Sequence, residues 1–141
     1  MTTDTDKTET NRKIVTDIMA GLAEGDNTRF AKAMRDDFTW RMMAVVPHWN
    51  RVYTGREAVG AFFQSVYAQY ATRQKTVPHR IIADGDTVAV EAEGGVTTVR
   101  GEPYNNRYCM IFDMEGGKIR EVREYLDTAL SDARFDVAAI A

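Results

Sequence analysis

The sequence predicts a single α+β domain in which a curved, mixed but mostly antiparallel sheet wraps around about three helices from the N-terminal half. Three observations lead to this prediction. Two segments with helical spacing of apolar residues come first, a third helical segment follows one strand, and the rest reads as strands separated by glycine-containing turns. Helices and strands that are segregated along the chain are typical of α+β folds. Because three helices are too few to fill such a sheet, an internal pocket is expected.

Composition limits the possible classes of function. The chain has 141 residues, 44% of them apolar and 28% charged, which fits one domain with a real core. A net charge of −3 without a basic stripe argues against a nucleic-acid partner. No apolar run is long enough to cross a membrane, and the first residues contain no secretory signal, so we expect a cytoplasmic protein. We expect residues 1–8 to be frayed or disordered, residues 9–130 to form the domain, and residues 131–141 to form a tail or short helix.

The helical segments are bounded by recognisable signals. Apolar residues recur every three to four positions in residues 9–24, and Asp26 is expected to cap a second helix that ends at residues 36–37. A third helix is expected after Thr54, because Thr54 and Glu57 have the spacing of a capping box.

The strand segments show period-two alternation. Residues 38–46 and 76–83 read as strands, and Pro78 places the second at a sheet edge or a bulge because proline donates no ladder hydrogen bond. Residues 87–99 read as one longer strand that bends at residues 94–95.

A central hairpin is expected over Tyr104–Asp127, with its turn at residues 115–117. If the inner faces of its two arms coincide, a carboxylate, an amide and a phenol lie among apolar side chains, as in many small-molecule pockets. The residues on these faces are Asn106, Tyr108, Met110 and Phe112 on the first arm, and Arg120, Val122, Glu124 and Leu126 on the second.

Glu124 is the main catalytic candidate. A carboxylate among apolar side chains loses hydration, so its pKa rises toward neutrality and it can act as a general acid or base near pH 7. The alternative is that Glu124 lies on the solvent face or pairs with Arg123 or Arg107.

Glu93, Glu91 and His48 are further candidates. The two glutamates share one strand face, and burial beside Glu124 would keep at least one carboxyl protonated. The alternative is a solvated strand face. Because histidine side chains in general can change charge near neutral pH, His48, beside Trp49 in a loop, is a second acid–base candidate, unless it is simply solvated.

Asn106 and Tyr108 can hydrogen-bond a ligand oxygen or orient Glu124; alternatively, they satisfy polar groups of the sheet. No metal-ligand spacing and no glycine-rich phosphate loop is present, so neither a metal nor a cofactor is expected. The other side chains expected to line the pocket are Trp40, Met42, Trp49, Phe63, Tyr67, Glu91 and Val122.

Two longer motifs carry a resemblance to a known superfamily. YTGREAV opens the third expected helix, and GxxYNNxYxxxFxxxxGKIxxxxEYxD spans the central hairpin. Together with the order of elements over residues 9–130, they resemble the SnoaL-like polyketide cyclase branch of the nuclear transport factor two-like (ketosteroid isomerase-like) superfamily. The resemblance implies a cone-shaped domain with a pocket between sheet and helices, a homodimer formed through the sheet, and a small hydrophobic ligand.

Individual positions limit which family activity the resemblance implies. Glu124 stands where limonene epoxide hydrolase has a catalytic aspartate, but Glu91 stands where that enzyme has an arginine, and this removes the electrophile that holds the epoxide oxygen. The ketosteroid isomerase base falls near Met42 and its oxyanion-hole acid near Cys109 or Met110, which cannot do that work. Neither mechanism is therefore expected.

Two functions remain from the sequence. In the first, a cofactor-free enzyme isomerises, cyclises or hydrates a polyketide, terpenoid or steroid-like ketone, with Glu124 moving the proton and His48 or Glu93 assisting. Asn106 and Tyr108 would orient the substrate. In the second, the same cavity only binds a ligand, or the domain is a dimerisation module. A buried Glu124 with a raised pKa would favour the first.

Overall fold

The computed structural model describes residues 3–141 as one curved, open sheet with helices on one side. The helices are α1 (Asp4–Ala23), α2 (Thr28–Ala33), η1 (Pro47–Trp49), α3 (Arg56–Tyr67), α4 (Thr128–Arg134) and η2 (Val137–Ala139), where η marks a 3-10 helix. The strands are β1 (Met34–Met42), β2 (Val52–Thr54), β3 (Thr76–Asp84), β4 (Thr87–Gly94), β5 (Val96–Thr97), β6 (Pro103–Tyr104), β7 (Arg107–Glu115) and β8 (Lys118–Leu126).

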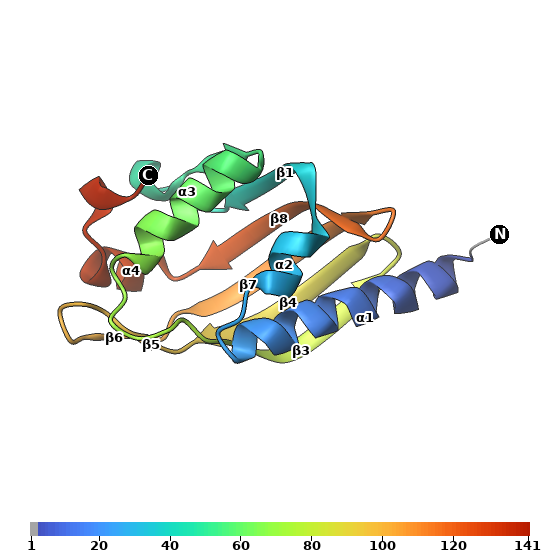
Figure 1. Ribbon diagram of the computed structural model, residues 1–141, viewed down its shortest axis with the longest axis horizontal. Helices are drawn as coiled ribbons and strands as arrows, with labels where there is room; N and C mark the ends of the chain where they lie inside the picture. The colour runs from blue at the N-terminus through green and yellow to red at the C-terminus, as the bar shows by residue number, and fades with distance from the viewer. Residues whose placement is uncertain (1–2) are drawn as a thin grey trace.

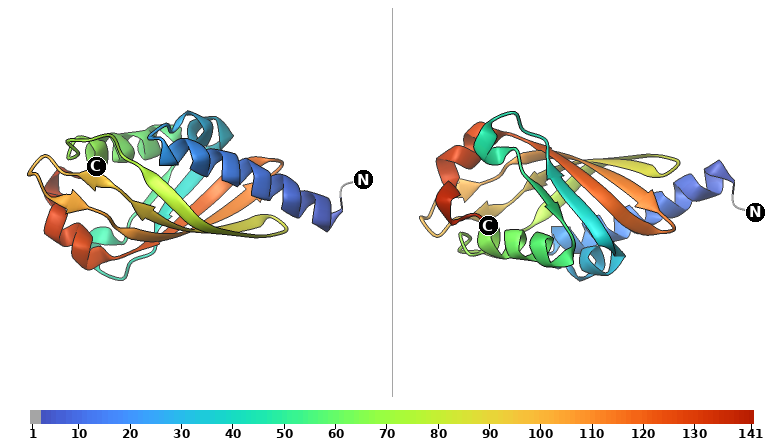
Figure 2. Two further views of the ribbon diagram at one scale, coloured as in Figure 1. Left: turned by 90° about the horizontal axis from the view of Figure 1, so that it is seen from below. Right: turned by 90° about the horizontal axis from the view of Figure 1, so that it is seen from above.

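The main sheet has the strand order β2-β1-β8-β7-β4-β3, and β5 pairs separately with β6. Strands β1 and β8 run parallel, whereas the other neighbours in the sheet are antiparallel. Helices α1, α2 and α3 lie on the same side of the sheet, and α4 lies at one end beside the C-terminus (Figures 1 and 2). The predicted mixed, mostly antiparallel α+β fold is confirmed.

The first helix is longer than the sequence pattern indicates. Thr3 caps it, because its hydroxyl accepts from the amide of Asp6 at 3.0 Å and the Asp6 carboxylate accepts from the amide of Thr3 at 3.5 Å. Residues 4–8, which we expected to be frayed with the rest of residues 1–8, therefore belong to α1. Residues 1 and 2 lie outside the described part of the chain.

The second helix follows Asp26, but its N-cap residue is Asn27, which makes no side-chain cap, and the helix ends early. The Asp26 carboxylate accepts from the amide and the hydroxyl of Thr28, at 2.9 and 2.6 Å. Helix α2 stops at Ala33, and residues 36–37, which we expected at its end, already belong to β1. The chain forms a strand from Met34 onward, in place of a longer helix, because Met34 pairs with Ile119 of β8.

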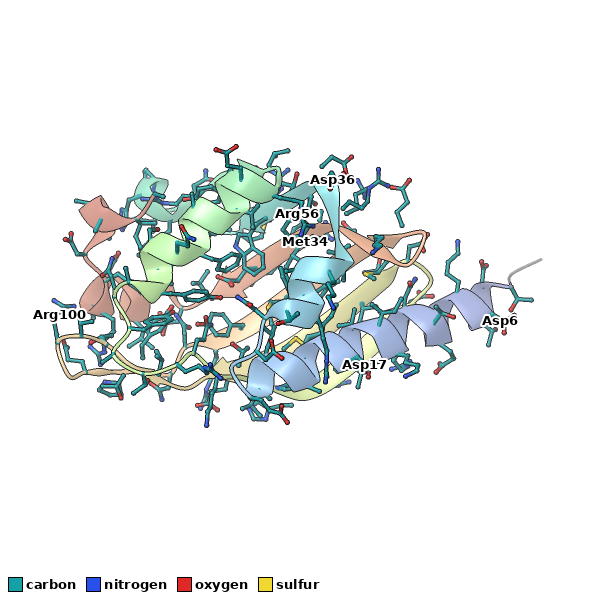
Figure 3. The ribbon with its side chains drawn as sticks, viewed as in Figure 1. Asp6, Asp17, Met34, Asp36, Arg56 and Arg100 are labelled. Atoms are coloured by element: carbon teal, nitrogen blue, oxygen red, sulfur yellow. The ribbon has the colours of Figure 1, made fainter. Side chains whose placement is uncertain are left out.

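The capping box predicted at Thr54 is wrong. Thr54 is the last residue of β2 and lies opposite Thr39 of β1, and the two hydroxyl oxygens are 3.1 Å apart. The residue before α3 is Gly55, whose φ of +90° favours glycine, and it makes no side-chain cap. Helix α3 is instead tied to the start of β1, since Arg56 donates to the carbonyl of Met34 at 2.9 Å (Figure 3).

The central hairpin is confirmed as β7 and β8, with its turn at Gly116 and Gly117. One of its predicted faces is wrong. Asp113 pairs with Glu121 and Met114 pairs with Ile119, so Arg120 is an extra, bulged residue. Arg120 is exposed, and it does not share the inner face of Glu124.

The edges of the sheet follow the prediction only in part. Strand β3 is an edge strand with a register shift beside Pro78, as predicted. The strand expected over residues 87–99 is broken, because β4 ends at Gly94 and a separate β5 follows. A Cβ at Gly94 would lie 3.2 Å from the ring of Tyr108, so the glycine lets that ring approach the strand.

The C-terminal segment docks on the domain. Asp127 caps α4 by accepting from the amides of Ala129 and Leu130, at 3.0 and 3.3 Å. Beyond it, Phe135 and Ile140 are each 8% exposed and belong to the core. Residues 131–141, expected to be a tail or short helix, thus cover one end of the sheet. Among the described helices, none combines the length and apolarity needed to span a bilayer.

Candidate functional site

The main cavity lies between α1, α2, α3 and the inner face of the sheet, and its volume is about 310 Å³. Residues from α1, α2, α3 and the sheet all line this space. A volume of this size suits a small organic molecule. The larger apolar side chains of its wall are Leu22, Phe30, Met34, Trp40, Val59 and Phe63. The polar side chains that interrupt this wall are Asn27, Gln64, Tyr67, Gln74, Thr76, Tyr108 and Glu124.

Glu124 reaches the cavity because of its place in the sheet. Strand β8 is flanked on both sides, so Glu124 lies opposite Met42 of β1 and opposite Met110 of β7. Its neighbour on the same face, Val122, is fully buried. Two-residue periodicity therefore directs the Glu124 carboxyl away from the outer surface of the sheet and into the apolar interior.

The Glu124 carboxyl is poorly solvated. Within residues 3–141, no hydrogen bond or ion pair engages the Glu124 carboxyl, and loss of hydration is the cause of its pKa shift. The side chain is half-buried because its accessible surface faces the cavity. Loss of hydration disfavours the charged form and raises the pKa of Glu124 to about 8. At pH 7 the group is mainly protonated, so it can donate a hydrogen bond or a proton to a bound oxygen atom.

Four tyrosines surround the same region. Burial raises the pKa of Tyr67, Tyr70, Tyr104 and Tyr108, and the nearby Glu124 carboxyl adds to the effect. These phenols therefore keep their protons at physiological pH. Tyr67 and Tyr108 line the main cavity as neutral phenols; Tyr67 accepts a hydrogen bond from Asn27, whereas the Tyr108 hydroxyl donates to Tyr104.

A second cavity of about 50 Å³ adjoins the first. The two cavities share Phe63, Gln74, Tyr108 and Glu124, so Glu124 stands at their boundary. Phe135, from the C-terminal segment, lines this smaller cavity. A cavity of this size admits a water molecule or a small substituent.

The structure brings together most of the predicted apolar and aromatic site residues. Trp40, Phe63, Tyr67 and Tyr108 line the main cavity with Glu124. Two other predicted residues line the smaller cavity, namely Met42 and Trp49. Val122 is fully buried in the core and lines neither cavity.

Asn106 lies outside both cavities, contrary to the expectation that it contacts a ligand. It is fully buried, and its amide nitrogen donates to the carbonyl of Asp127 at 2.9 Å and to the hydroxyl of Ser131 at 3.1 Å. Its amide oxygen accepts from the amides of Arg107 and Asp127, at 2.8 and 3.0 Å. Because these groups are already paired, Asn106 joins β7 to the start of α4 and has a structural role.

The other predicted titratable groups are also placed away from Glu124. The register of β4 sets Val88, Val90 and Ala92 inward, so Glu91 and Glu93 lie on the outer face of the sheet. There Glu93 pairs with His79 at 3.4 Å. The alternative of a solvated strand face therefore describes these two glutamates.

His48 belongs to a separate surface cluster. Its Nε2 lies 2.6 Å from an Asp132 carboxylate oxygen, which also accepts from the Trp49 indole at 2.6 Å. The hydrogen bond from His48, followed by that from Trp49, lowers the pKa of Asp132. The cluster fastens η1 to α4 and does not face the main cavity.

Gln74 is a cavity residue that the sequence analysis missed. It lines both cavities, and its side-chain nitrogen donates to the hydroxyl of Thr76 at 3.2 Å. It lies in an irregular segment between α3 and β3, where no periodicity indicates which way a side chain points. Only the proximity in sequence to the edge strand was available as a signal.

Trp40 presents an unpaired donor beside the cavity. Within residues 3–141 its buried indole nitrogen has no hydrogen-bond partner. The indole meets the ring of Phe63 edge-on, with centroids 4.9 Å apart. In the same described range, no three or more His, Cys, Asp and Glu side chains are grouped as a metal-ion site.

The comparisons with known proteins agree with this architecture. The sequence profile of the SnoaL-like domain family matches residues 15–122. Comparison with curated protein sequences gives no significant match.

Three similar solved structures illustrate the likeness. One is a nuclear transport factor two-like protein from Anabaena variabilis ATCC 29413, with 27% identity, a TM-score of 0.69, and coverage of 90% of this chain and 94% of that chain. A second is TerC co-crystallised with polyporic acid, with 20% identity, a TM-score of 0.76, and coverage of 89% and 97%. A third, from Jannaschia sp. CCS1, is assigned as a SnoaL-like polyketide cyclase and has 16% identity, a TM-score of 0.75, and coverage of 91% and 92%.

Proposed function

The chain belongs to the SnoaL-like domain family, and from this premise we propose that it binds a small, largely apolar, oxygen-bearing molecule and acts on it by acid–base chemistry without a cofactor. Glu124 carries the proposal. It is a carboxyl group without a partner among residues 3–141, its pKa is raised to about 8, and it lies on the wall of a mainly apolar cavity. Such a group titrates near the operating pH, as general acid–base catalysis requires.

The proposed chemistry is a proton transfer within one substrate. Protonated Glu124 donates its proton to a carbonyl oxygen of the ligand, and the resulting carboxylate removes a proton from the carbon next to that carbonyl, which gives an enol. This sequence returns Glu124 to its starting form, so no further reactant is consumed in an isomerisation or cyclisation. Tyr67 supplies an additional hydrogen-bond donor from the same cavity. A polyketide, terpenoid or steroid-like ketone fits these requirements.

The names of similar structures point to the same class of ligand. TerC was crystallised with polyporic acid, and the Jannaschia protein is assigned as a polyketide cyclase. Because TerC and the Jannaschia protein are only 20% and 16% identical to this chain, their names serve here only to choose the compounds to test.

Binding without catalysis is the second candidate function, and one observation favours it. Among the described residues, Glu124 is the sole carboxyl or imidazole group that lines the two cavities. His48, Glu91 and Glu93 lie elsewhere. A reaction that needs a separate acid and base would have no second group of this kind.

The test compares wild type, Glu124→Gln and a matched control, Glu91→Gln, which removes one carboxylate from the outer face. Each protein is screened by thermal shift against hydrophobic ketones, lactones and epoxides, and each stabilising compound is analysed by mass spectrometry after incubation. We expect wild type and Glu91→Gln to convert a compound that Glu124→Gln binds unchanged. If all three proteins leave every bound compound unchanged, the protein is a binding protein and the catalytic role of Glu124 is refuted.

We also propose that the protein forms a homodimer through the outer face of the sheet. The helices α1, α2 and α3 cover the opposite face (Figure 2). Four apolar side chains that remain more than two-fifths exposed lie on the uncovered face of three strands, β2, β3 and β8. These are Val52, Val77, Ile82 and Tyr125. Burial of such side chains against a second copy would favour association.

A further inference from the structure

A third cavity continues the main cavity outward. Its volume is about 330 Å³, and it shares five lining residues with the main cavity: Leu22, Asn27, Tyr67, Gln74 and Thr76. Its remaining lining residues are Gly25, Tyr70, Thr72 and Arg73. We call this third cavity the outer basin, because Thr72 and Arg73 are exposed. The shared residues show that the two cavities adjoin, and Glu124 lines the main cavity but not the outer basin.

Arg73 gives the outer basin its charge. Among residues 3–141, it is the sole charged residue that lines the basin. Other arginines hold partners within the fold: Arg56 donates to backbone carbonyls, and Arg134 pairs with Glu102. No hydrogen bond or ion pair within the described residues engages the guanidinium of Arg73. The basin thus contains a cation whose five N–H donors are all available.

The position of Arg73 is defined by its neighbours. A Cβ at Gly25 would lie 2.3 Å from Cδ and 2.5 Å from Cγ of Arg73, so the arginine stem rests directly on the backbone of the α1–α2 connection. Asp26 is a nearby carboxyl group, and its pKa is lowered first by the hydrogen bonds from Thr28 and least by the positive charges of Arg29 and Arg73. That carboxylate is already engaged by Thr28, whose hydroxyl donates at 2.6 Å. Arg73 therefore remains free to bind something else.

We propose that the ligand of this protein is an elongated acid, with an apolar body in the main cavity and a carboxylate bound by Arg73 in the outer basin. This inference rests on the proposed function and narrows its substrate class to hydroxy acids or keto acids. The oxygen function that meets Glu124 lies at the inner end of the ligand, and the carboxylate lies at the outer end. A guanidinium matches the planar, two-oxygen geometry of a carboxylate.

The charge of the inner cavity is compatible with an acidic ligand. Among the described residues that line the main cavity, Glu124 is the sole acidic or basic one. Burial keeps its carboxyl mainly protonated, and so uncharged, at pH 7. No negative charge at the inner end therefore opposes the entry of an anion. Polar side chains, including Asn27 and Gln74, lie at the junction of the two cavities. They would contact the ligand where its apolar body meets its charged end.

The test uses three probes of increasing polarity at the outer end: 2-naphthol, methyl 6-hydroxy-2-naphthoate and 6-hydroxy-2-naphthoic acid. Dissociation constants are measured by isothermal titration for wild type, Arg73→Gln and a matched control, Arg107→Gln. Arg107 is also exposed, has no side-chain partner among the described residues, and lines none of the cavities. The two substitutions remove the same charge from the protein.

We expect wild type to bind the acid more tightly than its methyl ester. Arg73→Gln should weaken the acid about tenfold and leave the ester and 2-naphthol within about twofold, since a charge-assisted hydrogen-bonded pair is lost. Arg107→Gln should change none of the three constants by more than about twofold. Raising the salt concentration to about 1 M should reduce the preference of wild type for the acid, because a partly exposed ion pair is screened.

Two results would overturn the inference while leaving the cavity function intact. The first is equal affinity of wild type for acid and ester. The second is an equal loss of acid and ester binding in Arg73→Gln, which would mean that Arg73 shapes the basin without binding an anion. If wild type binds none of the three probes, including 2-naphthol, both the proposed function and this inference are refuted.

Discussion

The substitution Glu124→Gln tests the electrostatics of the cavity independently of any ligand. Glutamine keeps the size and polarity of the side chain but cannot ionise. In the unfolded chain Glu124 loses its proton near pH 4.5, whereas in the folded protein it keeps the proton up to about pH 8. Between these values the native state binds more protons than the unfolded state, so the stability of wild type falls as the pH rises. The variant lacks this dependence.

The size of the effect follows from the two pKa values. A pKa that moves from 4.5 to about 8 corresponds to roughly 5 kcal/mol over the whole range. From pH 5 to pH 8, wild type should therefore lose about 4 kcal/mol of stability relative to Glu124→Gln. For a domain of this size, that loss lowers the melting temperature by on the order of 10–15 °C.

The measurement is a series of thermal unfolding curves followed by circular dichroism at unit steps from pH 5 to pH 9. Wild type, Glu124→Gln and Glu91→Gln are compared at each pH. The difference in stability between two of these proteins removes the pH dependence of every group that titrates in both. We expect Glu91→Gln to follow wild type, since Glu91 is exposed on the outer face. Curves for wild type and Glu124→Gln that stay parallel within about 1 kcal/mol would refute the argument that Glu124 is buried without a partner.

Three further predictions concern other parts of the molecule. Asn106→Ala should lower the free energy of unfolding in urea by about 2–4 kcal/mol, because buried backbone groups of Asp127 lose their partner; a loss below about 1 kcal/mol would contradict the structural role. Asp132→Ala should reduce stability near pH 7 but make little difference well below pH 3.8. Hydrogen bonds from His48 and Trp49 lower the pKa of Asp132, and the stabilisation that they give disappears as the carboxyl is protonated. Melting curves of wild type and variant with the same offset at every pH would contradict this prediction. Light scattering at micromolar concentration should give twice the chain mass of 15.9 kDa, and a single-chain mass would exclude the proposed dimer.

The sequence predicted the central hairpin and the cavity-facing position of Glu124 for the same physical reason. Apolar residues alternate through β7 and β8, and the register places Glu124 on the face of Val122 and Met110. Period-two alternation is a direct consequence of strand geometry. The bulge at Arg120 was not visible, because an extra residue in a strand leaves no mark in the alternation of its neighbours.

Local signals were misleading where tertiary contacts decided the outcome. Asn106 has the spacing of an inner-face residue, but it precedes β7, which starts at Arg107, and it bonds to the start of α4. Thr54 fits a capping box, yet pairing with Thr39 makes it part of β2. Contacts between residues far apart in the sequence overrode local propensity in both cases.

The positions of residues in irregular segments could not be predicted from sequence periodicity. Gln74 and Arg73 follow α3 in a connection that has neither helical nor strand periodicity. Their place at the cavities depends on how this connection packs against the α1–α2 turn. The neighbouring glycine, Gly25, makes room for the Arg73 stem.

The parallel pairing of β1 with β8 bears on how the protein acquires its site. Trp40 pairs with Val122, which follows it 82 residues later, and the amide of Met43 donates to the carbonyl of Glu124 at 2.8 Å. During synthesis, the hairpin of β3 and β4 can pair as soon as it emerges, and β1 can pair with β2, but the pairing of β1 with β8 must wait until β8 emerges. Contacts of such long range slow folding. The wall that carries Glu124 is thus assembled late, and the earlier segments must keep Trp40 and its aromatic neighbours out of wrong contacts until β8 arrives.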